Sequence, residues 1–214
     1  MTFKAVLWDF GGVITSSPFE AFNRFESANN LPQDFIRSIN ATNPENNAWA
    51  QLESSQIGID EFDEKFAREA ADKGHEVRGR QVLDLLSGEI RDEMVHALRL
   101  IKQTRQVGCI TNNVNTGEGP GMARSAEKAA AIADIMAIFD VVIESSKVGI
   151  RKPDPRIYEM TCKHMSIRPE ETIYLDDLGI NLKPARALGM TTIKVLGASQ
   201  ALDELESHLG EALR

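Results

Sequence analysis

The sequence predicts an α/β protein: a doubly wound parallel sheet with helices on both faces, joined to a smaller helical unit. Three observations predict this fold class. Five short runs are apolar throughout, helical patterns alternate with the later runs, and the stretch from Pro18 to Gln103 contains no convincing strand pattern. Strands that are apolar on both faces are typical of a parallel sheet covered by helices, and alternating strands and helices are typical of doubly wound cores.

The five apolar runs are rich in Val, Ile, Leu and aromatic residues, and each ends at Asp, Gly, Thr, Ser or Glu. Short runs of this composition with such boundaries predict buried strands. The predicted strands are Phe3–Trp8, Val107–Ile110, Phe139–Ile143, Thr172–Leu175 and Thr192–Leu196.

Helical patterns lie between and after the later strands. Ala123–Ala137 is rich in alanine, Pro155–Met165 carries apolar residues at helical spacing, and Leu182–Leu188 is a short helical pattern. Leu202–Arg214 is expected to form a closing helix, and the run GEGPG at Gly117–Gly121 predicts a flexible loop. These elements supply the helices that a parallel sheet requires between its strands.

The long stretch after the first strand has a different pattern. Phenylalanine and aliphatic residues recur there at helical spacing in several short groups, which are separated by Pro and Gly residues. This pattern predicts an insert of several short helices. The chain is therefore divided into a core, residues 1–17 and 104–214, and a helical insert, residues 18–103. The last helix of the insert, at about Asp92–Gln103, is expected to return toward the core.

The composition limits the possible partners. The 214 residues are 42% hydrophobic and 26% charged, values that suit a packed globular protein, and the formal net charge is −8. An acidic chain without a Lys/Arg-rich run repels nucleic acids and anionic membranes, so neither is expected as a partner. Cys109 and Cys162 show no metal-ligand spacing, and no signal peptide or membrane span is apparent, so a cytoplasmic location is expected. The oligomeric state is not predicted.

Polar residues that can perform chemistry follow the ends of the predicted strands. Ligands bind at the carboxyl ends of strands in open α/β sheets, so these residues are expected to converge on one cleft. An attacking carboxylate, a hard cation held by oxygen ligands and a lysine with Thr or Asn donors are the components of phosphoryl transfer. The residues concerned are Asp9, Thr111, Asn112, Lys152, Asp176 and Asp177.

Four segments of the chain resemble the four motifs of the haloacid dehalogenase superfamily, in the same order and at plausible spacing. The segments read DFGGVITS, ITNN, SSKVGIRKPDPRIY and YLDDLGINLKPARALGM, and the last two are the most specific. The resemblance implies a Rossmann-like core, and the insert is similar to the small helical C1-type cap of the family. The first two segments also resemble a subgroup that includes the N-terminal phosphatase-like domain of soluble epoxide hydrolases and related domains fused to acyl-CoA dehydrogenases.

The resemblance implies a Mg²⁺-dependent hydrolase, a phosphatase acting on a small phosphorylated substrate, and it implies a role for each matching residue. Asp9 would be the nucleophile and a Mg²⁺ ligand, and Gly11 would offer its backbone carbonyl to the metal. Lys152 would pair with Asp9 and with the transferred phosphoryl group. The remaining roles are phosphoryl binding by Thr111 and Asn112, Mg²⁺ coordination by Asp176, and support of the site by Asp177.

The first motif departs from the family pattern at one position. Family phosphatases usually read Asp-x-Asp, and the second Asp is the general acid for the leaving alcohol, whereas Gly11 occupies its place here. General acid–base catalysis contributes ~10²–10⁴-fold in rate, so its loss is a real handicap. The leaving group could be good enough to need no proton, a cap residue or water could supply the proton, or the site could serve another purpose. If the site is a phosphatase, slow turnover and an accumulating phosphoenzyme are expected.

Within the insert, Asn46, Asn47 and Trp49 form a polar and aromatic group that could face the substrate or could pack the short helices together. Two alternatives to the phosphatase remain open. A metal-independent 2-haloacid dehalogenase would use the same carboxylate to attack carbon. A catalytically impaired member of the fold would bind a phosphorylated metabolite or a partner protein without turnover.

Overall fold

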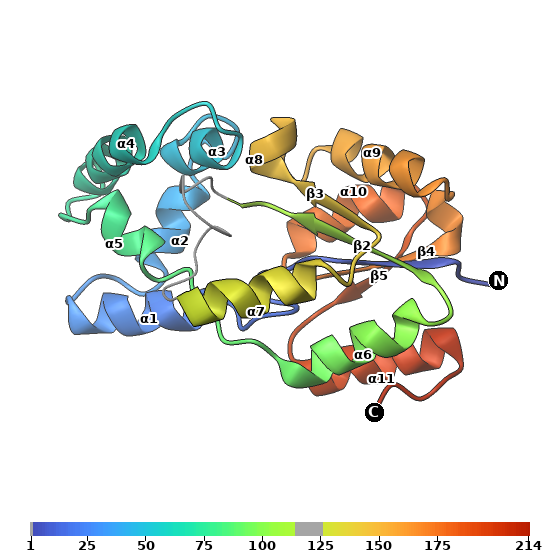
Figure 1. Ribbon diagram of the computed structural model, residues 1–214. Coiled ribbons are helices and arrows are strands. Elements are labelled where there is room, and N and C mark those ends of the chain that lie inside the picture. The colour runs from blue at the N-terminus through green and yellow to red at the C-terminus, as the bar shows by residue number, and fades with distance from the viewer. Residues whose placement is uncertain (1, 114–125) are drawn as a thin grey trace.

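The computed structural model describes residues 2–113 and 126–214 and has a five-stranded sheet in the order β3-β2-β1-β4-β5, with every neighbouring pair parallel. This topology confirms the predicted doubly wound α/β fold (Figure 1). All five predicted strands are present, and their bounds differ from the expected ones by three residues or fewer. The strands are β1 Ala5–Trp8, β2 Gln106–Thr111, β3 Val141–Glu144, β4 Thr172–Asp176 and β5 Thr191–Lys194.

The two faces of the sheet are covered by different sets of helices (Figure 1). One face packs against α6 (Asp92–Lys102), α7 (Ala126–Met136) and α11 (Ala198–Leu209) in one hydrophobic cluster. The opposite face packs against α9 (Pro155–Met165) and α10 (Gly179–Ala187) in a second cluster. Every residue of β1 and β4 is buried, because apolar side chains on both sides of these strands face helices.

Two helices of the core begin earlier than the sequence pattern indicates. Helix α10 starts at Gly179 rather than Leu182, because the carboxylate of Asp176 accepts the backbone N–H of Leu178 at the helix entry. Helix α11 runs over Ala198–Leu209 and ends at Gly210, whose φ of 70° terminates the helix before the expected end at Arg214. Helix α9 has the predicted bounds. Residues 123–125 of the alanine-rich segment and the Gly117–Gly121 run lie outside the described residues.

The insert forms a separate helical layer at one end of the sheet, the cap, with its own hydrophobic cluster (Figure 1). Residues 18–103 contain no strand, as expected. Phe22, Phe62 and Phe66 are buried at the centre of the cap. The five cap helices are α1 Phe19–Ala28, α2 Phe35–Asn40, α3 Ala48–Glu53, α4 Ile59–Ala71 and α5 Gly79–Leu83.

Helix α6 belongs by its packing to the core. Its residues Met94, Leu98 and Ile101 are fully buried in the cluster that contains β1 and β2, not in the cluster of the cap. The packing boundary between cap and core therefore lies before α6, close to the short bridge between Thr15 and Ile90 where the two chain segments that lead to and from the cap meet.

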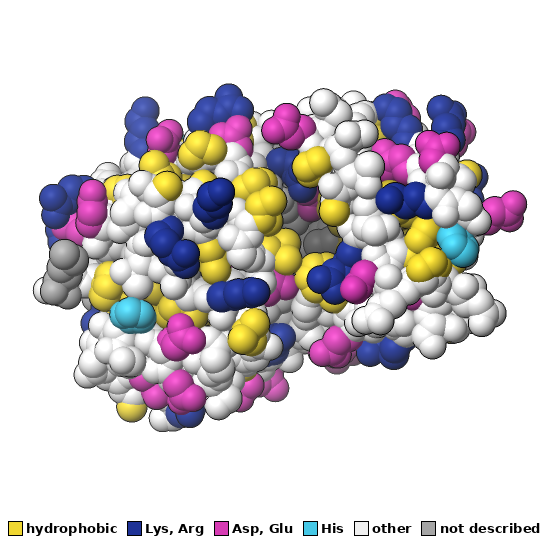
Figure 2. Space-filling model, turned by 180° about the vertical axis from the view of Figure 1, so that it is seen from behind, with side chains coloured by type: hydrophobic (Ala, Val, Ile, Leu, Met, Phe, Trp, Pro, Cys, Tyr) yellow, Lys and Arg dark blue, Asp and Glu magenta, His cyan; other side chains and the backbone are white. Residues whose placement is uncertain are grey.

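Charged side chains of both signs are interspersed over the face of the molecule in Figure 2, and a hollow lies near the middle of that face. The mixed surface agrees with the absence of a basic run from the sequence, whose net charge is −8. No helix in the described part of the chain is long and apolar enough to cross a membrane.

The packing of α6 generates a stability prediction. Leu98→Ala removes a fully buried side chain from the core cluster, so it should lower the free energy of unfolding by about 2–5 kcal/mol. The matched control is Arg99→Ala, because Arg99 is the next residue and is exposed, and it should change that free energy by less than about 0.5 kcal/mol. Urea denaturation of both variants measures the difference, and equal values would contradict the core assignment of α6.

Candidate active site

The predicted site residues converge at the carboxyl edge of the sheet. Asp9 directly follows β1, Thr111 is the last residue of β2 and Asp176 is the last residue of β4. Lys152 reaches the same place from the loop between α8 (Ser145–Val148) and α9. Its Nζ lies 2.8 Å from Asp9 Oδ1 and 2.8 Å from Asp176 Oδ2. Oxygens of Asp9, Asp176 and Asp177 lie within 4.8 Å of one another.

Lys152 is the charged centre of the site, and its side chain is only 1% exposed. Burial by itself would lower the pKa of this ammonium group, but the adjacent carboxylates of Asp176 and Asp9 outweigh burial and raise it above its usual value. Lys152 therefore stays positively charged, and it can hold a carboxylate and a phosphoryl oxygen without exchanging a proton with either.

Asp176 is fully buried, and protein donors occupy both of its oxygens. Oδ2 accepts from Lys152 Nζ, from the hydroxyl of Tyr174 and from Asn181 Nδ2 at 3.1 Å. Oδ1 accepts from the N–H of Leu178 at 2.8 Å and from Asn181 Nδ2 at 3.1 Å. A carboxylate with this many donors is firmly fixed in place and has little capacity left for a further ligand.

Asp177 has a freer carboxylate than Asp176. It is half-buried, and its Oδ2 accepts from Ser17 Oγ at 3.2 Å. Gly12 lies directly beneath it: a Cβ on Gly12 would lie 2.3 Å from Asp177 Oδ2, and the φ of Gly12 is +78°. Both facts require glycine at position 12. Burial and the neighbouring charge of Asp176 raise the pKa of Asp177 to about 6.

Asp9 is buried, and its two carboxylate oxygens have different surroundings. Its Oδ1 accepts the N–H of Phe10 at 2.7 Å and pairs with Lys152, whereas Oδ2 has no hydrogen bond or ion pair with any described residue. Burial raises the pKa of Asp9 well above its usual value; Lys152 opposes that rise, and the charges of Asp176 and Asp177 add to it. Oδ2 is thus the oxygen of Asp9 that is free to bind a cation.

The donor set fits a hard divalent cation. Three acidic side chains share one ammonium group, so the cluster has excess negative charge that a cation would neutralise. Carboxylate and carbonyl oxygens are the ligands that Mg²⁺ prefers. Asp9 and Asp177 have oxygens free to bind it, and the carbonyl of Gly11 accepts no backbone hydrogen bond from a described residue. The ligands that fit best are thus Asp9, Asp177 and the Gly11 carbonyl.

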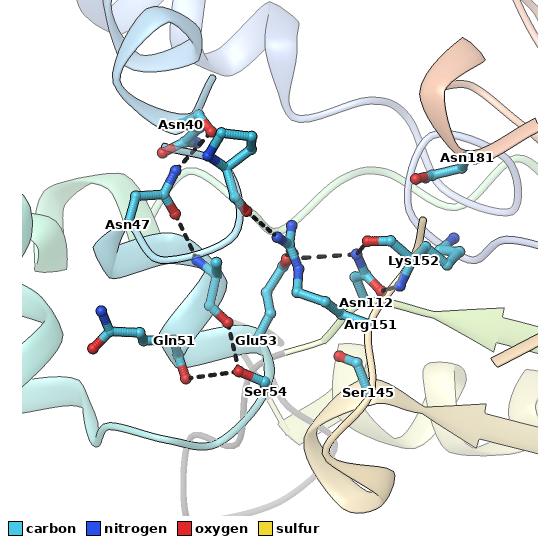
Figure 3. A network of polar contacts seen from close by, with 12 residues as sticks. Asn40, Asn47, Gln51, Glu53, Ser54, Asn112, Ser145, Arg151, Lys152 and Asn181 are labelled. Atoms are coloured by element: carbon cyan, nitrogen blue, oxygen red, sulfur yellow. Dashed lines mark hydrogen bonds and ion pairs between the residues drawn. The ribbon is translucent and has the colours of Figure 1, made fainter. Parts of the chain in front are cut away.

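The side chain of Asn112 holds the loop of Lys152. Its Oδ1 accepts the backbone N–H of Lys152 at 2.8 Å, and its Nδ2 donates to the carbonyl of Lys152 at 3.0 Å. Both polar atoms of the Asn112 amide are thus bonded to the protein backbone. The preceding residue, Thr111, is buried at the end of β2. Asn112 connects the end of β2 to the loop of Lys152 (Figure 3).

The three cap residues singled out in the sequence have different surroundings. Asn47 caps α3: its Oδ1 accepts from the N–H of Ala50, and its Nδ2 donates to the carbonyls of Asn40 and Thr42. Trp49 packs edge-on against Phe62, with ring centroids 5.7 Å apart. Asn46 is exposed. The side-chain contacts of Asn47 and Trp49 lie within the cap, as the packing alternative expects.

Besides Ser17, further residues that the sequence analysis did not single out contact the site. Tyr174 and Asn181 bind Asp176, and Glu53 of the cap pairs with Arg151 beside Lys152. Tyr174 could have been found, because it lies two residues before Asp176 on the same face of β4. Nothing in the sequence links Glu53 to Arg151, because they are distant along the chain.

Comparisons with known proteins identify similar sequences along almost the whole chain. Residues 3–189 match the family described as haloacid dehalogenase-like hydrolase. The chain is 33% identical to mouse (Mus musculus) acyl-CoA dehydrogenase family member 10 over 98% of this chain and 19% of that protein. It is 29% identical to mouse bifunctional epoxide hydrolase 2 over 98% of this chain and 39% of that protein, so it spans well under half of either relative. The sesquiterpene phosphatase astK of Aspergillus oryzae is 26% identical, with 98% of each chain covered.

Solved structures share the fold. A predicted HAD-like family hydrolase of Porphyromonas gingivalis superposes with a TM-score of 0.69 at 22% identity, covering 99% of this chain and 100% of that chain. A HAD family enzyme of Bacteroides thetaiotaomicron in complex with magnesium and inorganic phosphate has a TM-score of 0.56 at 21% identity, with 90% and 93% covered. A dehalogenase has a TM-score of 0.67 at 16% identity, with 98% of each chain covered.

The contrasting surroundings of the two adjacent aspartates predict opposite effects on stability. In EDTA, Asp177→Asn should raise the melting temperature, because it removes one of three crowded negative charges. Asp176→Asn should lower the free energy of unfolding by about 1–3 kcal/mol, because it disrupts a buried group that accepts from Lys152, Tyr174 and Asn181. Calorimetric melting with and without Mg²⁺ measures both effects.

If Asp177 is a metal ligand, the melting temperature of Asp177→Asn should also stop responding to Mg²⁺, whereas that of the wild type should rise with it. An Asp177→Asn protein that is less stable than the wild type in EDTA would contradict the charge-crowding argument.

Proposed function

Because the chain belongs to the haloacid dehalogenase-like hydrolases, we propose that it is a Mg²⁺-dependent phosphatase that cleaves a small phosphomonoester through an aspartyl-phosphate on Asp9. One observation carries the proposal. Lys152 is buried between Asp9 and Asp176, at 2.8 Å from each, beside the less constrained carboxylate of Asp177. The phosphatase named among the relatives supports the same class of reaction, and the structural neighbour that contains magnesium and phosphate supports the cofactor.

The geometry favours an assignment of the two adjacent aspartates that differs from the one implied by the sequence resemblance. We assign Mg²⁺ binding to Asp9, the Gly11 carbonyl and Asp177, and we assign Asp176 to the anchoring of Lys152. Asp176 already accepts from donors on both oxygens, whereas Asp177 accepts from Ser17 alone among side chains of the described residues. Bound Mg²⁺ would neutralise charge on the phosphoryl oxygens and favour attack by an anionic nucleophile.

The protein residues account for the two chemical steps. A carboxylate oxygen of Asp9 attacks phosphorus, a bond from that oxygen to phosphorus forms, and the bond from phosphorus to the leaving oxygen breaks with its electron pair. Lys152 holds Asp9 in line and, with the hydroxyl of Thr111, binds the transferred oxygens. A water molecule then attacks phosphorus, Asp9 departs as a carboxylate, and the proton of the water passes to solvent.

The substrate preference follows from Gly11. No side chain at this position can protonate the leaving oxygen, and a substrate whose leaving group is stable as an anion needs no such proton. Acyl, aryl and sugar anomeric phosphates have leaving groups of this kind. The cap covers the carboxyl edge of the sheet, so its residues would discriminate among these substrates.

The acidic cluster favours the phosphatase over a 2-haloacid dehalogenase. A dehalogenase needs no metal. Without a bound cation, the three carboxylates around one ammonium group would repel one another, and nothing in the dehalogenase reaction requires that arrangement. The likeness to a dehalogenase structure, at 16% identity, supports the shared fold alone.

The first test of the proposal is hydrolysis of p-nitrophenyl phosphate, whose leaving group needs no protonation. The wild type should be active with Mg²⁺ and inactive in EDTA, and Asp9→Asn should show only background activity, because amide oxygen is a poor nucleophile. Asp134→Asn, which alters an exposed aspartate of α7, is the control and should retain full activity. Activity that survives either EDTA or Asp9→Asn would exclude the proposed mechanism, and 2-haloacids would be assayed next.

Gly11→Asp should restore the missing proton donor. A Cβ at Gly11 meets no atom within 4 Å, and its φ lies outside the left-handed region, so the side chain can be accommodated. The variant should accelerate hydrolysis of alkyl phosphates by up to ~10²–10⁴-fold and should affect p-nitrophenyl phosphate much less. The dependence of log kcat on leaving-group pKa should become shallower.

Gly11→Asn is the matched control, because it has the same size and cannot donate a carboxyl proton. An equal acceleration by Gly11→Asn would show that volume rather than proton transfer is responsible.

A further inference from the structure

The cap contacts the core through a buried ion pair beside the site. Glu53 is the last residue of α3, and its Oε2 lies 2.6 Å from Nη2 of Arg151. The side chain of Glu53 is 8% exposed and that of Arg151 is 25% exposed. Figure 3 shows this pair between the cap helices and the loop that carries Lys152.

Arg151 is held by the cap at two points. Nη2 pairs with Glu53, and Nη1 donates to the carbonyl of Pro44 at 2.9 Å. Arg151 directly precedes Lys152, so the position of its backbone affects the position of the catalytic ammonium group. The cap thus holds the residue next to the lysine on which the chemistry depends.

Glu53 also contacts the second support of the lysine loop. Its Oε2 lies 3.5 Å from Nδ2 of Asn112, and the same Nδ2 donates to the carbonyl of Lys152 at 3.0 Å. Asn112 Oδ1 accepts the N–H of Lys152 at 2.8 Å. One cap carboxylate therefore contacts both residues that hold the backbone of Lys152.

The energetics of the pair favour a positional role over simple stabilisation. Burial raises the pKa of Glu53, and the charge of Arg151 opposes that rise, so the carboxylate is costly to bury and depends on its partner. Buried ion pairs often add little net stability, because desolvation offsets their attraction, but they constrain geometry. A purely adhesive contact between cap and core would be better made by apolar residues.

We propose that Glu53 is a positioning residue of the reaction: through Arg151 and Asn112 it fixes the loop of Lys152 when the cap covers the site. Glu53 acts without touching the phosphoryl group, and its removal leaves Asp9, Thr111 and the metal ligands in place. The proposal rests on the proposed function, since it assigns Lys152 to phosphoryl binding. A cap residue would thus help to align Lys152 with the phosphoryl group in the transition state, in addition to the part that the cap has in selecting the substrate.

The test compares Glu53→Gln, Glu53→Asp and Ser55→Ala. Glu53→Gln keeps the size and removes the charge, and it should lower kcat for p-nitrophenyl phosphate by about 10–100-fold, the scale expected when a reacting group is misplaced by about 1 Å. Glu53→Asp should recover part of kcat. Ser55→Ala is the control, because Ser55 Oγ donates to the Ser146 carbonyl at 2.8 Å, a contact between cap and core that does not involve Lys152, and it should leave kcat unchanged.

A second readout does not need turnover. Binding of inorganic phosphate with Mg²⁺, measured by calorimetry, should be weakened about tenfold or more in Glu53→Gln and unchanged in Ser55→Ala. An Arg151→Met, Glu53→Gln double variant should be no worse in kcat than the poorer single variant, because the two residues act as one unit.

The outcomes separate the two proposals. Wild-type activity equal to that of Asp9→Asn would overturn the phosphatase, and the phosphate titration would still test Glu53. Three results would each overturn the positioning role. Glu53→Gln could have the kcat and the phosphate affinity of the wild type, or Ser55→Ala could lose as much as Glu53→Gln. The third result is a loss of kcat in Glu53→Gln that only follows the folded fraction at the assay temperature.

Discussion

The buried ammonium group of Lys152 is the interaction on which the rest of the site depends. It lies between Asp9 and Asp176, which come from the ends of two neighbouring strands of the sheet. A buried cation is tolerated only if anions surround it, and crowded anions are tolerated only if a cation is present. Each of the three charges therefore requires the other two. The hydrogen bonds from Tyr174 and Asn181 to Asp176 extend this dependence into the helix that follows β4.

The sequence predicts most of the core because the relevant signals are local. Strands buried on both faces are continuous apolar runs, and the candidate site residues follow their ends, so the order of elements and the cleft can be inferred before any contact is known. The first residue of a helix is harder to predict where a side chain determines it, as Asp176 does for α10. The roles of Asp176 and Asp177 cannot be separated from the sequence, because adjacent carboxylates differ only in what surrounds them. Asn47 could have been identified as a helix cap from its residue type, but its burial could not.

The contacts between the cap and the core cannot be predicted from local sequence patterns. Its phenylalanines predict short helices, and those helices form their own hydrophobic cluster. The contacts that connect the cap to the chemistry are made by Glu53, Pro44 and Arg151, and no periodicity relates them. Their significance comes from spatial proximity to Asn112 and Lys152. Helix α6 illustrates the same limit, because its apolar spacing resembles that of the cap helices although it packs against the sheet.

Gly11 and Gly12 are neighbours with opposite constraints. The space next to Gly12 is filled by the carboxylate of Asp177, whereas the space next to Gly11 is empty. Codons for glycine and aspartate can differ by a single base. Packing therefore excludes a side chain at position 12 and admits one at position 11, so a single base change could place a carboxyl group at position 11 without rebuilding the loop. The glycine pair thus leaves this chain one base change away from an Asp-x-Asp sequence at positions 9 to 11.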